Sequence, residues 1–273
     1  MKRWGKLLAI VLLAVIWVIA DQRRLVTGRY ECAVEGLPEE FDGFRIVQLS
    51  DLHGAEFGAD NAALTERVAA LRPDLIALTG DLVEKREDLP VTERLLPALS
   101  AIAPTYFVSG NHEWGSGLMD ELDGQLTESG VVRLANRWQS VSRNGKRILL
   151  CGVEDPNSYA DMITPAELVS YLREEEGGET PVILLGHRNN WVEKYPELDV
   201  DVILCGHCHG GIVRLPFLGG LFSSNASLFP TYDAGAYAGE KYTMIVSRGL
   251  GIVHGLPRIG NPPEIVELTL RCA

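Results

Sequence analysis

Residues 44–54 read FRIVQLSDLHG, and this stretch decides the architecture expected for the chain. Its aliphatic run, Ile46 to Leu49, stops at a small residue and is followed at once by Asp51 and His53. Short apolar runs of this kind, bounded by turn residues, are typical of strands buried in a sheet. The stretch therefore predicts a buried strand that ends in two polar, chemically versatile side chains.

The same pattern recurs along the chain and alternates with helical periodicity. Further strand candidates are residues 75–80, 105–110, 147–154, 181–187, 200–207, 241–249 and 264–270. Helices are expected at Asp60–Leu71 with Asp60 as N-cap, at Val91–Ile102, at Leu118–Leu126, and at Thr164–Glu174, where Thr164 and Glu167 form a capping box. Such alternation predicts a layered α/β domain, and we expect residues 25–273 to form a single one.

The charge balance limits the partners of this domain. The chain of 273 residues holds 25 Lys and Arg against 37 Asp and Glu, which gives a formal net charge of −12. An acidic body repels a polyanion, so we expect no long nucleic acid as a partner. Any phosphate group that it handles needs local positive charge, such as a metal ion. Nothing in the sequence indicates a protein partner.

The N-terminus has the pattern of a membrane segment. Basic residues among the first six positions precede an unbroken apolar run, LLAIVLLAVIWVIA, from Leu7 to Ala20. We expect residues 1–24 to form a retained, single-pass anchor in the cell membrane, with a cleaved signal peptide and a buried helix as alternatives. The basic residues at the short N-terminal side predict that the catalytic domain is extracytoplasmic.

Residues that bind metals well follow five of the predicted strands. They are Asp51 and His53, Asp81, Asn111, His187, and His207 with His209. Ligand sites of layered α/β folds form beyond the carboxyl ends of strands. Each residue alone is more simply a cap, a turn residue or a satisfied histidine. Asp-x-His and His-x-His, however, direct two side chains to the same side of an extended segment, so the joint pattern predicts a metal centre.

The mixture of carboxylate, amide and imidazole indicates the type of metal. This set suits Mn²⁺, Fe, Co or Zn²⁺, and its size suits two divalent ions that share one carboxylate. Cys205-x-x-Cys208 also has the spacing of a redox or zinc motif, but there is no second cysteine pair and the interleaved histidines explain the segment better. A disulfide between Cys32 and Cys272 is open if their strands are neighbours.

These blocks together resemble the calcineurin-like metallophosphoesterase superfamily. The blocks are SDLHG (50–54), TGDLVE (79–84), SGNHEW (109–114), GH (186–187) and GHCHGG (206–211), in the order and approximate spacing of that superfamily. The flanking text and the tail are similar to its membrane-anchored bacterial subgroup. The resemblance implies two packed β-sheets flanked by helices, to which the predicted transmembrane anchor is added.

The resemblance also implies roles for the site residues. One metal ion would be held by Asp51, His53 and His209, and the other by Asn111, His187 and His207. Asp81 would bridge the two ions, and His112 would be the catalytic general acid. The superfamily often has an Asp where this chain has Glu84, so it is open whether Glu84 orients His112.

The expected substrate is a phosphate ester, a diester rather than a monoester, either a small molecule or a lipid-linked compound of the cell envelope. Arg188 and Arg214 are candidate substrate-binding residues, although a solvent-exposed or ion-paired arginine is an equally good interpretation. Arg248, Arg258 and His254 are weaker candidates. The alternative function is a non-catalytic, metal-containing binding module on the same fold. A nucleotidase acting on small nucleotides is a third hypothesis.

Overall fold

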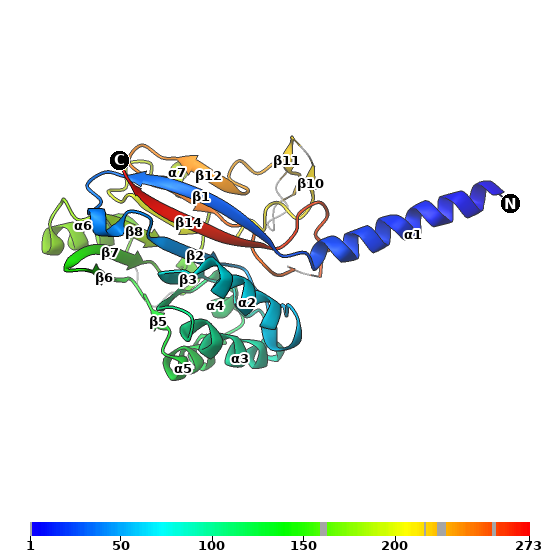
Figure 1. Ribbon diagram of the computed structural model, residues 1–273, viewed down its shortest axis with the longest axis horizontal. Coiled ribbons are helices and arrows are strands. Elements are labelled where there is room, and N and C mark those ends of the chain that lie inside the picture. Colours follow the sequence, from blue (N-terminus) through cyan, green and yellow to red (C-terminus); the bar gives the residue numbers. More distant parts are fainter. Residues whose placement is uncertain (1, 159–162, 216, 223–227, 253–254) are drawn as a thin grey trace.

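The structure is a computed structural model that describes residues 2–158, 163–215, 217–222, 228–252 and 255–273. Two β-sheets pack face to face, and helices cover the outer face of each, which gives four layers (Figure 1). Helix α1 (Lys2–Gln22) extends away from this body. The two packed sheets with flanking helices confirm the layered α/β fold expected from the sequence.

The strands of both sheets are short, and the inner ones are mostly parallel. In the described residues the first sheet has the order β1 (Val26–Val34), β14 (Glu264–Cys272), β2 (Arg45–Leu49), β3 (Leu75–Thr79), β4 (Thr105–Val108) and β5 (Val132–Arg133). The second has the order β12 (Gly235–Ala238), β13 (Thr243–Val246), β9 (Val202–Cys205), β8 (Val182–Leu185), β7 (Lys146–Gly152) and β6 (Arg137–Arg143). A small ribbon pairs β10 (Arg214–Leu215) with β11 (Gly219–Gly220).

Both faces of the central strands are buried, and β3 shows how. Leu75 and Ala77 point into the core between the two sheets, whereas Ile76 and Leu78 point to the core beneath the helices. Side chains alternate along a strand, so a run that is apolar at every position fills two cores at once. For this reason polar residues do not alternate with apolar ones in the aliphatic runs of the sequence.

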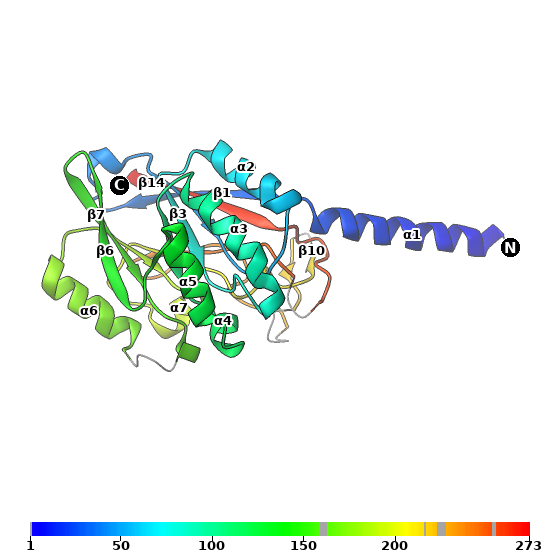
Figure 2. The same cartoon turned by 90° about the horizontal axis from the view of Figure 1, so that it is seen from below.

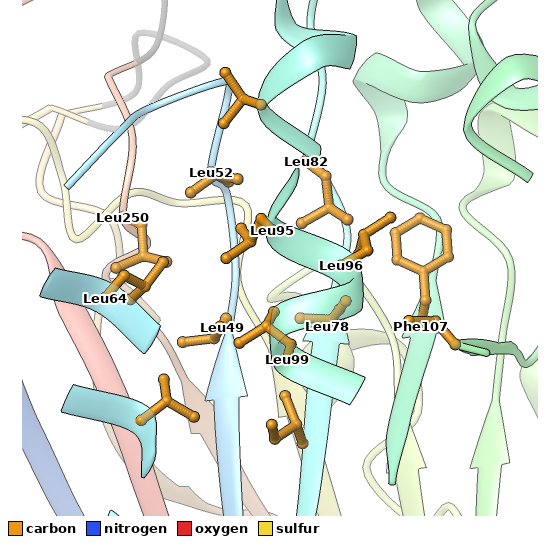
Figure 3. Close-up of a cluster of buried hydrophobic side chains, with 14 of the residues drawn as sticks. Leu49, Leu52, Leu64, Leu78, Leu82, Leu95, Leu96, Leu99, Phe107 and Leu250 are labelled. Carbon is orange, nitrogen blue, oxygen red and sulfur yellow. The ribbon is translucent and has the colours of Figure 1, made fainter. Parts of the chain in front are cut away.

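Helices α2 (Ala62–Leu71), α3 (Leu89–Ser100) and α5 (Met119–Ser129) cover the first sheet (Figure 2). Their apolar sides pack on β2, β3 and β4, and Figure 3 shows Leu95, Leu96 and Leu99 of α3 in this cluster. The same cluster includes Leu52 and Leu82, which lie in the loops directly after β2 and β3. The core therefore anchors the two loops that carry Asp51, His53 and Asp81.

Helices α6 (Pro165–Glu176) and α7 (Trp191–Lys194) cover the second sheet, where Trp191 packs with residues of β7, β8 and β9. The short helix α4 (Asn111–Gly115) follows β4 directly. The capping box at α6 is confirmed, because Thr164 Oγ1 accepts from the Glu167 amide at 3.2 Å and Glu167 Oε2 accepts from the Thr164 amide at 2.8 Å.

Asp60 is not the N-cap of α2, so that prediction is wrong. The helix begins at Ala62 after a 3₁₀ turn (Ala59–Asn61), and Asp60 has a left-handed backbone with φ 51°. The Asp60 carboxylate instead forms an ion pair with Arg94 of α3 at 2.8 Å. Asn61, and not Asp60, is the residue that precedes the helix.

The predicted transmembrane anchor is also wrong, and with it the single-pass membrane location. Among the described residues, no helix has the combination of length and apolar character needed to cross a bilayer. The physical reason is length: the apolar run of α1 holds 14 residues between Lys6 and Asp21, which in a helix extends about 21 Å, against a hydrocarbon core of about 30 Å.

All five cysteines are free thiols, and only Cys272 is exposed. Strands β1 and β14 are neighbours, but Cys32 is paired in register with Leu270, and no disulfide links it to Cys272. Burial raises the pKa of Cys151 and of Cys208 to about 12, which suppresses the reactive thiolate.

We expect one thiol, that of Cys272, to react rapidly with a thiol-specific reagent in the native protein, and the remaining thiols to react only after unfolding. The measurement is a titration with a chromogenic disulfide reagent before and after addition of guanidinium chloride. Cys272→Ser is the control and should abolish the rapid phase. Rapid labelling of Cys208 in that variant would contradict the burial seen here.

Candidate metal centre

The predicted ligand residues meet where strands of the two sheets end. Asp51 and His53 follow β2, Asp81 follows β3 and Asn111 follows β4, all in the first sheet; His187 follows β8, and His207 and His209 follow β9, in the second. The carboxyl ends of parallel strands lie at one edge of a sheet, and the packing of the two sheets brings the two edges together. All seven predicted residues lie at this common edge.

The loops reach this point through a left-handed backbone rather than an extended one. The φ angles are 52° at Asp51, 46° at His53, 55° at Asp81, 69° at His207 and 52° at His209. The expectation that Asp-x-His and His-x-His converge through strand alternation is therefore wrong. Each such residue costs about 1–3 kcal/mol, and such strain is retained where the surrounding structure over-determines it.

Four buried residues form a first ligand cluster: Asp51, His53, Asp81 and His209. The Nε2 atoms of His53 and His209 are 3.1 Å apart, and His53 Nε2 lies 3.7 Å from Asp81 Oδ2. Asp51 Oδ1 lies 3.5 Å from His209 Nε2. Four ligand atoms from three loops thus face one small volume.

A second cluster shares Asp81 with the first and adds His187 and His207. His187 Nε2 lies 3.1 Å from Asp81 Oδ2, 3.1 Å from His207 Nδ1 and 3.2 Å from Asn111 Oδ1. The other ring nitrogen of His187, Nδ1, is 2.9 Å from the Thr79 carbonyl and donates to it. This bond fixes the ring so that Nε2 faces the cluster.

The arrangement of donor atoms in the two clusters suits metal ligation better than it suits hydrogen bonding among the side chains. One ring nitrogen of His187 lies near two oxygens and a nitrogen, and a single N–H cannot serve all three. Ligand atoms at right angles on an ion with bonds of about 2.1 Å are about 3 Å apart, which matches these separations. The Nε2 atoms of His53 and His209, 3.1 Å apart, likewise face the same small volume as the Asp51 carboxylate.

The charges within the clusters are strongly coupled. Burial disfavours the imidazolium form of His187, but the carboxylates of Asp81, Asp51 and Asp155 together outweigh burial and raise the pKa of His187 to about 10. Burial likewise opposes the charge of Asp81, yet the neighbouring His187 holds the pKa of that carboxyl well below its usual range. Without a metal, Asp81 and His187 therefore form a buried ion pair at neutral pH.

Glu113 supports the site and was missed by the sequence analysis. Its buried carboxylate accepts from the backbone amides of Asp81 at 3.0 Å, Leu82 at 2.5 Å and Gly110 at 2.7 Å. It therefore joins the turn that carries Asp81 to the turn that carries Asn111. Its place in the GNHE block is the feature of the sequence that would have indicated such a role.

His112 lies beside the first cluster and is partly accessible, with 20% of its side chain exposed. Its Nε2 is 4.0 Å from Asp81 Oδ2, and its backbone amide donates to Asp81 Oδ1 at 2.9 Å. The Glu84 carboxylate lies between two imidazole rings. Its Oε1 is 3.9 Å from His112 Nδ1, and its Oε2 is 3.3 Å from His53 Nδ1. Glu84 thus reaches both histidines and lies closer to His53.

The two candidate substrate arginines have different surroundings. Arg188 forms a bidentate ion pair with buried Asp155, at 2.6 and 3.0 Å, and its Nη1 lies 3.2 Å from His207 Nε2. Arg214 forms an ion pair with Asp233 at 2.8 Å and donates to the carbonyl of Gly210 at 2.7 Å. Only Arg188 therefore contacts a residue of the ligand clusters.

The weaker candidates have structural partners or lie elsewhere. Arg248 pairs with Glu264 at 2.9 Å. Arg258 is buried and donates to three backbone carbonyls, of which those of Asn261 and Gly251 are both 2.8 Å away. His254 lies outside the described residues.

The chain is similar in sequence to proteins of one described family. Residues 44–211, more than half of the chain, match the family described as Calcineurin-like phosphoesterase. The chain belongs to this family. It is 27% identical over 246 residues to the metallophosphoesterase YkuE of Bacillus subtilis, with 86% of this chain and 82% of YkuE covered. It is 28% identical over 234 residues to the phosphodiesterase YaeI of Escherichia coli, with 83% and 82% covered.

A solved structure, TT1561 of Thermus thermophilus, has a TM-score of 0.46 and 16% identity over 76% of this chain and 90% of that one. Membership of the family makes this calcineurin-like phosphoesterase a metal-dependent hydrolase of phosphoric esters, as the sequence predicted. The family typically binds two divalent metals, and the two clusters are the candidate sites for them.

Gly206→Ala is expected to weaken metal binding about 10–100-fold. A Cβ at Gly206 would lie 2.0 Å from Ser50 Oγ and 2.2 Å from Asp51 Oδ2, so the Asp51 carboxylate must move. Gly124→Ala is the matched control, because nothing lies within 4 Å of the added Cβ. Metal affinity is measured by calorimetric titration with Mn²⁺, and equal affinity in both variants would contradict the close approach.

Metal binding at pH 7 is expected to release at least one proton per protein, because His187 must lose its proton and the pKa values of the ligands His53 and Asp51 are also raised. The pKa of His187 in the metal-free protein is about 10, so the ring is protonated below that pH and must lose its proton to bind a metal. The association constant should therefore fall at least about tenfold for each unit of pH between 8 and 6. Calorimetry in buffers of different ionisation enthalpy measures the release, and its absence would contradict the buried ion pair.

Proposed function

We propose that residues 25–273 hydrolyse phosphodiesters with two divalent metal ions as cofactors. The proposed ligands are Asp51, His53, Asp81 and His209 for one ion and Asp81, Asn111, His187 and His207 for the other. Ions such as Mn²⁺, Fe, Co or Zn²⁺ suit this set. The observation that carries the proposal is that Asp81 belongs to both clusters, which is the arrangement of a carboxylate shared by two ions.

The metal ions would supply an activated water and positive charge for the phosphoryl oxygens. The protein supplies the proton for the departing alkoxide, and His112 is the proposed donor. It lies at the accessible side of the first cluster, 4.0 Å from the shared carboxylate of Asp81. Burial lowers the pKa of His112 and so disfavours the protonated ring that a general acid needs, whereas the neighbouring Asp81 carboxylate favours it.

Arg188 is the proposed contact to the substrate phosphate. A guanidinium group only donates, so its bond to His207 Nε2 requires the lone pair of that nitrogen. When His207 Nδ1 holds a metal ion, the ring proton lies on Nε2 and this bond is lost. The Nη1 donor of Arg188 is then available to a phosphoryl oxygen, while Asp155 keeps the group in place. A substrate role for Arg214 stays a prediction.

The diester preference is supported by the similarity to YaeI, which is named a phosphodiesterase. The substrate is proposed to be a small phosphate ester; a lipid-linked or envelope ester stays a prediction.

His112→Ala is expected to lower kcat about 10²–10⁴-fold, because it removes the proposed proton donor. Turnover is measured with methyl phenyl phosphate and Mn²⁺, because the departing phenolate, with a conjugate-acid pKa of about 10 like that of the tyrosine phenol, leaves poorly without a proton. Metal content should stay at the wild-type level, since His112 belongs to neither of the two proposed ligand sets.

Asn111→Ala is the companion variant and should lose metal as well as activity. Equal turnover of His112→Ala and wild type would contradict the role of His112. An absence of turnover in metal-loaded wild type with any phosphate ester would contradict the proposed function and favour the non-catalytic module.

A further inference from the structure

Two residues near the C-terminal end of the chain donate hydrogen bonds to the backbone of the first ligand cluster. The Gly251 amide donates to the Asp51 carbonyl at 2.7 Å, and Asn261 Nδ2 donates to the His209 carbonyl at 2.7 Å. Both donors follow the family match, which ends at residue 211. They therefore join a part of the chain outside that match to two proposed metal ligands, one from each sheet.

The two ligand residues that accept these bonds have a strained backbone. Asp51 and His209 are both left-handed, each with φ 52°. Such a conformation costs about 1–3 kcal/mol and persists only where neighbouring groups hold it. A donor bonded to the carbonyl of each residue fixes the orientation of the peptide group that follows the ligand. The two bonds thus act at the positions where the loops would otherwise relax.

The approach to the Asp51 loop is close enough to require glycine. A Cβ at Gly251 would lie 2.1 Å from the Leu52 carbonyl oxygen, and a Cβ at Gly249 would lie 2.7 Å from Cβ of Asp51. Between these glycines, Leu250 belongs to the same buried cluster as Leu52 (Figure 3). The loop therefore has no room to move towards this segment, and the position of the segment limits the position of Asp51.

One side chain, that of Arg258, connects the two donor residues. Its Nη1 donates to the Gly251 carbonyl and its Nε donates to the Asn261 carbonyl, both at 2.8 Å, while Nη2 donates to the Arg248 carbonyl. The guanidinium group presents its donors in a rigid, planar fork. Arg258, which is only 2% exposed, therefore fixes Gly251 relative to Asn261.

The charge of Arg258 also suits a position beside a metal ligand. Burial lowers the pKa of Arg258 to about 10, and the charge that most strongly opposes this shift is the Asp51 carboxylate. The guanidinium therefore remains charged at neutral pH and favours the ionised form of Asp51 in return. The ionised carboxylate is the form that binds a metal ion.

These contacts act mainly on one of the two clusters. Asp51 and His209 both belong to the first cluster. In the second cluster, the ring of His187 is fixed by its bond to the Thr79 carbonyl. The link to the second cluster is indirect, since the Asp51 carboxylate accepts from the His207 amide at 3.0 Å. Loss of the contacts should therefore affect the first metal ion more than the second.

We propose that Arg258 and Asn261 are positioning residues of the first metal site. Asn261 holds the backbone of His209, and Arg258 holds both Asn261 and Gly251, whose amide holds the backbone of Asp51. The inference rests on the proposed function, in which Asp51 and His209 bind one of the two ions. It assigns Arg258 to the metal site through these ligands rather than to the substrate phosphate.

The first test is Asn261→Ala, which removes the donor to His209 and keeps the main-chain carbonyl that accepts from Arg258. It should weaken the binding of one Mn²⁺ ion about 10–100-fold, the usual effect of losing a group that orients a metal ligand. Calorimetric titration of the metal-free protein measures this. In the Asn111→Ala background, which lacks a ligand of the second ion, Asn261→Ala should weaken the ion that remains.

Asn61→Ala is the matched control for Asn261→Ala. Asn61 is also buried and bonds a backbone group, the Phe57 amide at 2.9 Å, but it does not contact a ligand residue. It should lower the melting temperature and leave the affinity for both ions unchanged. The visible absorption of the Co²⁺-loaded protein reports the geometry around the ions, and it should change in Asn261→Ala and not in Asn61→Ala.

The second test is Arg258→Lys, which keeps the charge and removes the fork. It should weaken the same ion as Asn261→Ala. The double variant should lose less affinity than the product of the two single losses, because Arg258 acts partly through Asn261. Arg173→Lys is its control, since Arg173 donates to the carbonyls of Thr180 and Asp199, away from the site.

Wild-type affinity for both ions in Asn261→Ala would overturn the inference, whether or not Arg258→Lys folds. An equal loss of affinity in Asn61→Ala would also overturn it, because the effect would then be general destabilisation. A wild-type protein that binds no Mn²⁺ would instead contradict the proposed function, and with it the site that these residues position.

Discussion

The shared carboxylate of Asp81 is the constraint on which the centre depends. It faces His53 and His187 through Oδ2 and accepts the His112 amide through Oδ1. A buried carboxylate survives only if positive groups and donors surround it. Glu113 fixes the turn that carries Asp81 by accepting its backbone amide. The loops of both sheets are therefore positioned relative to one charged group.

The packing of the two sheets supplies the rigidity that this arrangement needs. Gln48 of β2 donates at 2.9 Å both to Thr79 Oγ1 in its own sheet and to the Cys205 carbonyl in the other sheet. Leu52 and Leu82, next to the ligand residues, are buried beneath the helices. The left-handed loops that carry the ligand residues are thus held by apolar packing beneath the helices and by hydrogen bonds between the two sheets. The strain of the loops is offset by the core.

The sequence alone predicted the two sheets and brought the candidate ligand residues to light, because both follow from local patterns; their role as metal ligands stays a prediction. An apolar run such as residues 75–79 predicts a strand that is buried on both faces. A metal-binding residue that follows the run in the sequence then lies at the end of that strand. The errors had different causes. Asp60 pairs with Arg94 instead of capping its helix. The apolar character of the run Leu7–Ala20 suggested a membrane span that its length does not support.

What the sequence by itself determined is the family, the hydrolytic class and the candidate metal-binding side chains, since these depend on residue types in a fixed order. Only the tertiary structure decided which of them share Asp81, that Glu84 lies closer to His53 than to His112, and that Arg188 is held by Asp155. These relations join positions far apart in the chain. They depend on distances across the two sheets, which no local pattern of residues encodes.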